Sequence, residues 1–232
     1  MTRQLFLTIA VLVVSFLTFE VTQIDLLLQD QLYNFESASW LIDRDNPVFK
    51  FLFYDGIKAF YILFIISLII TLSFYRKRKL VKPRVRGLVI VLASTIIIPI
   101  SVNMLKATTN VSCPKDLARY GGTYPYVAVL GTYPESFVQK RAARCYPAGH
   151  ASGGFALLSL FFLFKRTRSR VIAVVSGLTV GWSLGLYKMF IGDHFLGHTV
   201  MTMMLSWLII LLIDTALHTP PKIATEPNPA LT

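Results

Sequence analysis

Three of the four histidines of this chain stand where an imidazole could do chemistry, at the ends of apolar runs and level with lysines. His150 begins one apolar run, while His194 and His198 lie four residues apart where the last two runs meet. Lys106 and Lys188 end two further runs. Neutral imidazole is a nucleophile near pH 7, imidazolium can act as an acid, and ammonium groups attract anions. These residue types favour a site for an anionic headgroup at one membrane surface.

The composition indicates which elements must position these residues. Of 232 residues, 54% are hydrophobic and 15% are charged, against roughly 45–50% apolar and about 25% charged in a typical soluble domain. With a mean hydropathy of +0.60, the chain is neither disordered nor a typical soluble enzyme. The net charge of +11 arises from short basic clusters between apolar runs, a pattern typical of cytoplasmic anchoring rather than of nucleic-acid binding.

Six apolar runs are candidate transmembrane helices, spanning residues 5–22, 55–75, 87–105, 150–164, 171–190 and 196–216. The fourth is short, but Lys165 and Arg166 behind it can snorkel toward the headgroups. We therefore predict an all-α integral membrane bundle of six transmembrane helices, residues 1–218, with a disordered cytoplasmic tail, residues 219–232. The first run lacks a cleavage pattern typical of a signal peptide, and we expect a retained anchor.

Charges in the connections predict the orientation of the bundle. Residues 76–86 carry seven basic side chains and residues 165–170 carry four, which places both connections in the cytoplasm. Residues 23–46 have an acidic excess and fit the opposite side. Both termini are then cytoplasmic, and the long loop of residues 106–149, between spans three and four, is extracytoplasmic. We expect a bacterial inner-membrane protein whose site faces the periplasm.

The start of the fourth span is suited to binding an anion. Proline at 147 fits a first helical position, and Gly149 lets a ligand approach the backbone closely. Free amides at a helix start can cradle a phosphate. We therefore place Gly149, His150 and the two lysines in one site.

Three motifs in this region resemble those of the type 2 phosphatidic acid phosphatase superfamily, which includes lipid phosphate phosphatases, bacterial acid phosphatases and vanadium haloperoxidases. The family's first motif is Lys, six residues, Arg-Pro; its second is Pro-Ser-Gly-His; its third is Ser-Arg, five residues, His, three residues, Asp. With the same spacing, this chain has Lys106 and Cys113-Pro114, then Pro147-Ala148-Gly149-His150, then Tyr187-Lys188, His194 and His198.

The resemblance implies a phosphohistidine mechanism that needs no metal and no cofactor. His194 would attack phosphorus and His150 would protonate the departing oxygen. The phosphoryl oxygens would be held by Lys106, Lys188 and the Gly149 amide, with Ala148 at the position of the motif serine. Cys113 and Lys188 replace two arginines and so remove bidentate phosphate donors; Lys115, Arg119 or Arg144 could compensate for that loss.

His198 stands where the family uses aspartate to orient the nucleophile. A neutral imidazole can accept the same hydrogen bond but supplies no negative charge, which Asp193 or Asp116 could provide. Asp214 could not, because sixteen helical residues beyond His198 put it about 24 Å away.

The resemblance and the compartment together favour a disulfide between Cys113 and Cys145. An extracytoplasmic loop permits it, and closing about 33 residues would restrict the unfolded chain by roughly 3–4 kcal/mol. The bond would join motif one to motif two. Two unrelated thiols are the alternative.

The predicted function is a membrane lipid phosphatase that hydrolyses a phosphomonoester or pyrophosphate of a lipid. Alternatives are a lipid phosphotransferase with the same intermediate, and a non-catalytic membrane protein that binds or translocates lipid phosphates. A zinc or haem site at His194 and His198 is a further alternative. The expected partners are the lipid phosphate substrate and membrane lipids.

Overall fold

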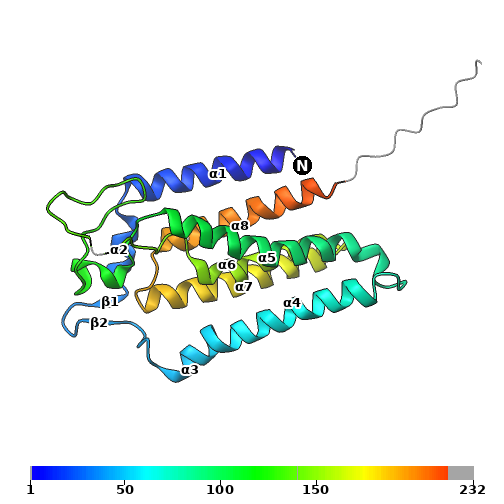
Figure 1. Ribbon diagram of the computed structural model, residues 1–232, viewed down its shortest axis with the longest axis horizontal. Helices are drawn as coiled ribbons and strands as arrows, with labels where there is room; N and C mark the ends of the chain where they lie inside the picture. Colours follow the sequence, from blue (N-terminus) through cyan, green and yellow to red (C-terminus); the bar gives the residue numbers. More distant parts are fainter. Residues whose placement is uncertain (1, 140, 219–232) are drawn as a thin grey trace, which may run out of the picture.

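The computed structural model describes residues 2–139 and 141–218, and within them the chain is a bundle of helices that run along one axis (Figure 1). The predicted tail, residues 219–232, lies outside the described residues. The long helices and the helix that opens the fourth apolar run are α1 (Thr2–Val21), α4 (Gly56–Phe74), α5 (Val85–Thr108), α6 (Gly149–Ala156), α7 (Thr167–Phe190) and α8 (Leu196–Ala216).

Shorter elements join these helices. They are α2 (Ile24–Asp30), the antiparallel pair β1 (Tyr33–Asn34) and β2 (Ser39–Trp40), α3 (Pro47–Lys50), a π-helical turn (Phe51–Asp55), and 3₁₀ segments at Lys82–Arg84, Pro114–Asp116, Ala118–Tyr120 and Leu157–Leu163. The small hairpin is a departure from the predicted all-helical fold.

Five helices in the described part of the chain are long and apolar enough to cross a membrane: Arg3–Val21, Pro47–Phe74, Lys82–Thr108, Thr167–Phe190 and Leu196–Ala216. They correspond to five of the six predicted spans. The fourth predicted span, residues 150–164, corresponds to the shorter apolar segment Gly149–Leu163, which has eight α-helical residues followed by seven 3₁₀ residues.

The second span starts earlier than the predicted residue 55. The Asn46 side chain accepts hydrogen bonds from the amides of Val48 and Phe49, at 3.0 and 3.3 Å, and Pro47 follows as first helical residue. This cap begins the helix at Pro47, and the π-helical turn then leads into α4 without a break.

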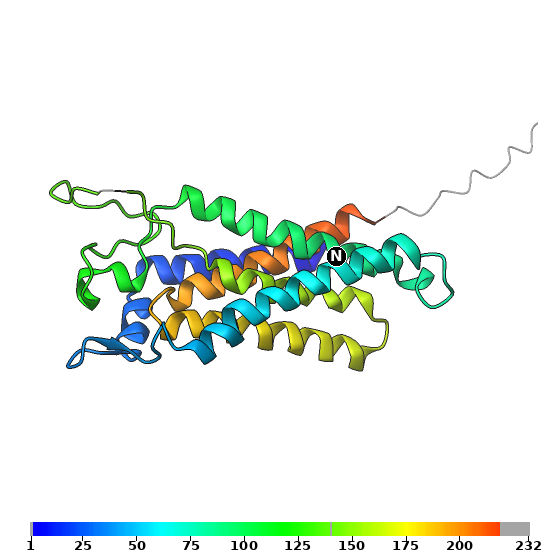
Figure 2. The ribbon, with the colours of Figure 1, turned by 60° about the horizontal axis from the view of Figure 1, so that its bottom comes forward.

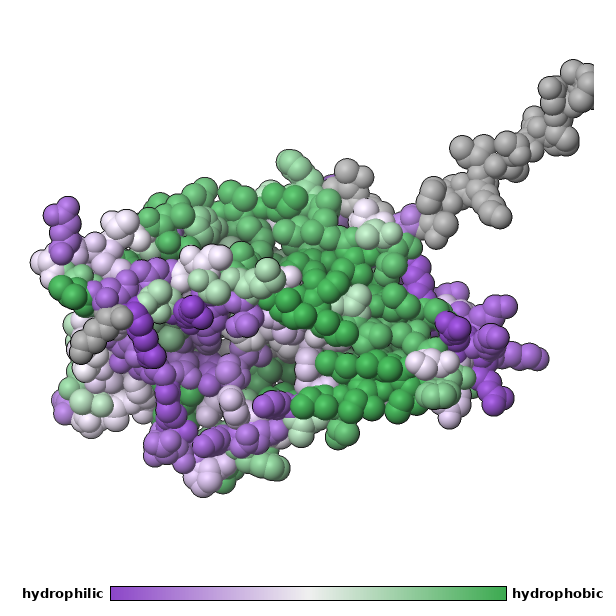
Figure 3. Space-filling view, in the orientation of Figure 1, coloured by the Kyte–Doolittle hydropathy of each residue, from purple (hydrophilic) through white to green (hydrophobic). Residues whose placement is uncertain are grey.

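Helices α5 to α8 pack on one another and form the core, whereas α1 packs along α8 and α4 packs along α5. Ile90, Ile98, Phe155 and Ile210 are fully buried at the centre of this core. The outward sides of the bundle are apolar, and Figure 3 shows them as a hydrophobic band between two hydrophilic ends. Such a band is typical of a protein surrounded by lipid.

Helices α6 and α7 meet at glycines, which allow their backbones to touch. A Cβ atom on Gly154 would lie 2.5 Å from the Cα of Gly181, and one on Gly177 would lie 2.8 Å from the backbone nitrogen of Leu158. Any larger side chain would push the helices apart. Close contact of this kind gives strong van der Waals packing between membrane helices.

Proline inside α5 provides an attachment for α4. Pro99 has no N–H, so the carbonyl of Thr95 lacks its helical donor. The hydroxyl of Tyr61, on α4, donates a hydrogen bond of 2.9 Å to that carbonyl. The contact satisfies a polar group that would otherwise be unpaired in an apolar region.

The two ends of the bundle differ in chemistry. One end carries the turn between α4 and α5 and the end of α8, where Arg86 contacts Asp214 at 2.5 Å. The other end gathers α2, the hairpin and the long loop between α5 and α6, as Figures 1 and 2 both show. Asp214 therefore lies far from His194 and His198, as predicted.

Side chains from the N-terminal elements hold the long loop in place. Glu20, at the end of α1, accepts hydrogen bonds of 3.0 Å from the amides of Val129 and Leu130. Asp30 pairs with Arg119 at 2.6 Å. The loop is thereby fixed over the end of the bundle that carries the histidines.

Candidate active site

His194 lies in the short turn between α7 and α8. The amides of Asp193 and His194 both donate to the carbonyl of Lys188, at 2.7 and 3.2 Å. Gly192 has φ of +72°, and a Cβ there would lie 2.2 Å from the indole of Trp40, so only glycine fits this turn. The turn places the imidazole of His194 inside the protein, where 3% of the residue is exposed.

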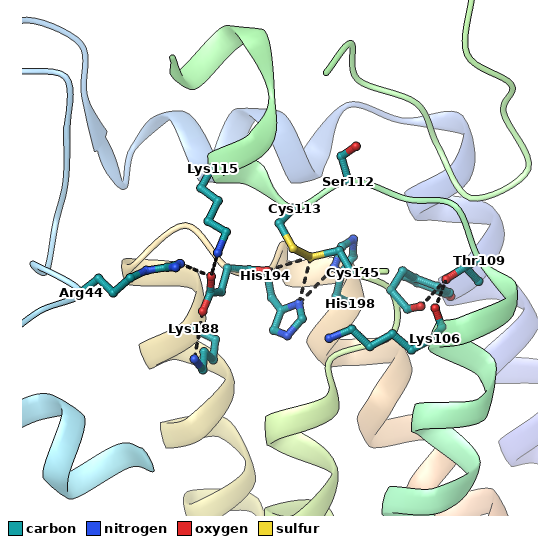
Figure 4. Close-up of a disulfide and its surroundings, with 12 residues drawn as sticks. Arg44, Lys106, Thr109, Ser112, Cys113, Lys115, Cys145, Lys188, His194 and His198 are labelled. Carbon is teal, nitrogen blue, oxygen red and sulfur yellow. Dashed lines mark hydrogen bonds and ion pairs between the residues drawn. A yellow bond between two sulfur atoms is a disulfide. The ribbon is translucent and has the colours of Figure 1, made fainter. Parts of the chain in front are cut away.

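The ring of His194 is held through its Nδ1 atom (Figure 4). This atom lies 3.5 Å from Nδ1 of His198 and 3.4 Å from Sγ of Cys145. A disulfide sulfur carries no hydrogen and is only a weak acceptor, so the ring nitrogen of His198 is the stronger partner for a proton on Nδ1 of His194. With its proton on Nδ1, His194 keeps the lone pair of Nε2 free for attack.

The surroundings of His194 favour its neutral form. Burial, together with the nearby charges of His198 and Lys106, holds the pKa of His194 well below its usual value. Figure 4 shows the side chain of Lys106 reaching from α5 toward this ring. The neutral ring is the form that can act as a nucleophile.

His198 belongs to the first turn of α8 and is buried. Its ring packs edge-on against Tyr146 and Phe195. These contacts hold the ring toward His194.

The start of α6 is tied to the start of α8. The Ala148 amide donates to the carbonyl of His198 at 3.3 Å, and the Thr202 hydroxyl donates to the carbonyl of Ala148 at 3.2 Å. A Cβ on Gly149 would lie 3.9 Å from Nζ of Lys106. Ala148, Gly149 and Lys106 are therefore together, as the sequence predicted.

His150 follows Gly149 and faces a cavity of about 250 Å³ between α4, α5, α6 and α7. The Tyr54 ring, from the π-helical turn, lies 5.2 Å from the His150 ring. Most of the remaining lining is apolar and includes Ile57, Phe60, Leu157 and Leu184. The cavity therefore joins one catalytic candidate to a space suited to a hydrocarbon chain.

Three cations surround the carboxylate of Asp193. Lys188 and Lys115 contact it at 2.9 Å each, and Arg44 forms a third ion pair with it. Burial alone would raise the pKa of Asp193, but these positive charges and hydrogen bonds hold the pKa well below its usual value. Asp193 is therefore ionised and engaged with cations; among the described residues no hydrogen bond joins its carboxylate to His194 or His198.

Cys113 and Cys145 form a disulfide, the pair expected from the sequence, with their Cα atoms 5.2 Å apart. Together with the amide of Cys145, which donates to the carbonyl of Val111 at 3.0 Å, it fastens the loop after α5 to the segment before α6. Because its sulfur is in this bond, Cys145 is no thiolate ligand. The cluster of Cys145, His194 and His198 therefore has only two possible metal ligands, the imidazoles. Catalytic zinc typically has three protein ligands.

The predicted compensating cations have different positions. Lys115 contacts Asp193, and Arg119 pairs with Asp30 at the outer surface. Arg144 lines an open cavity together with Lys115 and Asp116. Of these three residues, Lys115 shares the carboxylate of Asp193 with Lys188.

Two residues near the site were not predicted, Arg44 and Tyr54. Arg44 lies in an acidic segment without a motif, and its partner Asp193 is 149 residues away. Tyr54 lies one residue before the predicted start of its span. The tyrosine could have been noticed only from the cap at Asn46, which shifts the helix start toward the N-terminus.

Comparison with known protein families gives one match in this region. A family model described as the PAP2 superfamily matches residues 87–220, more than half of the chain. A comparison with curated proteins found no match, and neither did a comparison with solved structures. The matched residues contain α5 from Gly87 onward, α6 to α8, and every position of the three motifs.

Proposed function

We propose, since the chain belongs to the PAP2 superfamily, that it is a membrane phosphatase that removes the terminal phosphate of a lipid phosphate or diphosphate. Family membership supports hydrolysis of a phosphoric ester. The observation that carries the finer proposal is the buried pair of rings, in which Nδ1 of His194 faces Nδ1 of His198 beside Lys106.

The proposed reaction has two steps. First, Nε2 of His194 forms a bond to phosphorus while the bond from phosphorus to the lipid oxygen breaks, and His150 gives that oxygen a proton. Second, water attacks the phosphohistidine, His150 takes the proton from that water, and phosphate leaves with His194 restored. Lys106, Lys188 and the Gly149 amide stabilise the charge on the phosphoryl oxygens.

The cavity beside His150 supports a lipid as the substrate. It begins at the proposed acid and continues along apolar side chains of four helices. A hydrocarbon chain in this cavity would place its phosphate at the polar end of the bundle. A small, water-soluble phosphate ester would leave these apolar surfaces unused.

The fourth helical segment completes a bundle of six spans in this proposal. Its eight α-helical residues at about 1.5 Å and seven 3₁₀ residues at about 2.0 Å give about 26 Å. That is close to the roughly 30 Å of a hydrocarbon core, and Lys165 and Arg166 follow directly. The 3₁₀ geometry lengthens a segment that would be too short as an α-helix.

Phosphate release by purified protein tests the function. We expect release from a lipid monophosphate, a lipid diphosphate or both, and much less from a water-soluble phosphate monoester at equal concentration. A His194→Ala protein purified in the same way sets the background. Preference for the soluble ester would contradict a lipid substrate, and no release from any of the three would contradict a phosphatase.

Cysteine accessibility tests the proposed orientation, with the basic loops in the cytoplasm of a bacterial cell and the site toward the periplasm. The native cysteines form a disulfide, so single cysteines introduced at Lys77 and Tyr124 should react alone with a maleimide. We expect an impermeant maleimide to label position 124 on intact cells and position 77 only after lysis. The reverse pattern would contradict the orientation.

A further inference from the structure

The carboxylate of Asp193 brings together cations from three separate parts of the chain. Arg44 comes from the segment between β2 and α3, Lys115 from the 3₁₀ turn after Cys113, and Lys188 from the last turn of α7. The Arg44 segment is fastened at its base, because the Ile42 amide donates to the carbonyl of Phe190 at 3.3 Å. Arg44 therefore lies at the end of α7, beside the turn that carries His194.

The positive charge of this cluster exceeds its negative charge. Three cations contact one carboxylate, which leaves two positive charges uncompensated. The side chain of Lys106 reaches from α5 toward the His194 ring beside this cluster (Figure 4). Asp45 and Lys50, which line the adjoining cavity of about 190 Å³ with Arg44, add one charge of each sign. A further anion would balance the cluster.

Arg44 is the guanidinium of the cluster, whereas the other cations are ammonium groups. A guanidinium can donate two parallel hydrogen bonds to a phosphate, which an ammonium cannot do in the same geometry. Both arginines of the family's motifs are replaced here, by Cys113 and by Lys188. The chain therefore has a fork-shaped donor at the site, supplied from outside the matched residues 87–220.

We propose that Arg44 is a phosphate-binding residue, and that the Asp193 carboxylate holds Arg44, Lys115 and Lys188 in place until a substrate phosphate takes its position among them. This inference rests on the proposed function, because it names a binding residue of the same site. No bond is made or broken in the exchange; one anion replaces another beside the same cations.

A double-mutant cycle separates this role from a structural one. If Arg44 only anchors its segment to Asp193, removing Arg44 has no further effect on phosphate binding once residue 193 is neutral. If Arg44 binds phosphate, Arg44→Gln weakens binding in the wild-type background and at least as much in the Asp193→Asn background, where no carboxylate competes for the guanidinium. Asp193→Asn alone frees the cations and should lower the inhibition constant of inorganic phosphate.

The measured quantities are kcat, KM for the lipid phosphate, and the inhibition constant of inorganic phosphate. Loss of a charge-assisted hydrogen bond predicts that Arg44→Gln raises KM and the inhibition constant at least about tenfold, with kcat changed less. Arg44→Lys should recover part of the loss. An unchanged inhibition constant when Arg44→Gln is added to Asp193→Asn would overturn the proposal.

The matched control is the pair Arg119 and Asp30. Its arginine and aspartate side chains are 50% and 19% exposed, against 43% and 16% for Arg44 and Asp193. Arg119→Gln and Asp30→Asn should leave KM and phosphate inhibition unchanged. An equal effect of Arg119→Gln would show a general surface-charge effect and overturn the assignment to Arg44.

Calorimetry of inorganic phosphate binding to each purified variant distinguishes this inference from the proposed function. Phosphate binding that depends on Arg44 in a protein without phosphatase activity would reject the proposed function and keep the inference. Phosphatase activity with binding independent of Arg44 would reject the inference alone. Absence of phosphate binding by the wild-type protein would reject the inference as well. Gel filtration and thermal unfolding identify misfolded variants. If Arg44→Gln misfolds, Arg44→Lys replaces it in these measurements.

Discussion

The core of α5 to α8 and the N-terminal elements before it contribute differently to the site. The core lies within the family match and carries both lysines and all three histidines of the motifs. The N-terminal elements carry no motif, yet Arg44, Tyr54 and Asp25 reach the same end of the bundle. In the proposed mechanism the core provides the reacting groups, whereas the N-terminal elements provide their surroundings.

The largest effect is expected in the core, at the nucleophile. We predict that His194→Ala lowers phosphate release at least about 10³-fold, since no other group then forms the bond to phosphorus. His150→Ala should be nearly as severe. His218→Ala is the matched control, because this fourth histidine lies near Arg86 at the opposite end and should be dispensable.

Radiolabelled substrate sharpens the assignment of the nucleophile. Wild-type protein quenched during turnover should carry acid-labile phosphate, and the His194→Ala protein should carry none. Equal labelling of both proteins would place the nucleophile elsewhere.

Loss of the disulfide should have the next largest effect, on stability. Replacing Cys113 and Cys145 by serine removes a link that spans 32 residues, and we expect the free energy of unfolding to fall by about 3–4 kcal/mol. Denaturation of the purified protein measures this. Mass spectrometry of unreduced peptides provides the control, and two free thiols in protein from its native membrane would contradict the bond.

His198 should have a smaller effect on activity than His194. An orienting carboxylate in a serine-protease triad contributes about 10⁴-fold, and a neutral ring should contribute less, so His198→Ala should lower kcat by roughly 10- to 100-fold. His198→Asp should keep part of the activity, because the aspartate carboxylate can accept a hydrogen bond from Nδ1–H of His194. Full activity of His198→Ala would remove this residue from the mechanism.

Asp25 tests how the N-terminal elements support the core. From α2, its carboxylate accepts a hydrogen bond of 2.7 Å from the amide of Gly197, at the start of α8. Burial raises the pKa of Asp25 from 3.8 to about 6, although the Gly197 amide opposes the shift. A raised pKa means that this residue stabilises the fold most below pH 3.8 and that the stabilisation is lost as the pH rises through about 6.

The corresponding variant, Asp25→Asn, keeps an acceptor for the Gly197 amide but has no proton to lose. In the wild type, deprotonation of Asp25 contributes to a decrease in unfolding temperature between pH 4 and 6. We expect that contribution to be absent from the variant. Thermal unfolding at a series of pH values measures it, and the wild-type pH dependence in the variant would contradict the assignment.

The smallest effect is expected at the exposed contact between α2 and the long loop. Arg119→Gln breaks the ion pair with Asp30, and exposed pairs contribute about 0–1 kcal/mol. The free energy of unfolding should change within that range. A loss of several kcal/mol would show that the N-terminal elements hold the loop more tightly than this pair suggests.

The sequence predicted the parts of the fold that depend on local patterns. The last span begins at Leu196 and ends at Ala216, as expected, because most of its side chains are apolar. The second span was predicted to start at residue 55, since a hydropathy pattern does not register the cap that Asn46 forms. The 3₁₀ geometry of Leu157–Leu163 was missed for a related reason: it depends on packing against α5 and α7.

The same distinction applies to the site. Lys106, Gly149 and His194 could be placed together because motif spacing survives even where residue types change. Arg44 could not be, because nothing in residues 42–46 indicates a partner 149 residues away. Long-range ion pairs of this kind depend on tertiary structure, which one sequence does not reveal.

The glycine contact between α6 and α7 has a consequence for the timing of catalysis. Two helices whose backbones touch at Gly154 and Gly181 can neither slide nor separate without losing that contact. The contact thereby restrains the spacing between His150, at the start of α6, and Lys188, at the end of α7. In the proposed mechanism these residues are the acid and a phosphate-binding cation, so the free-energy cost of aligning them is met when the protein folds rather than when the phosphate arrives.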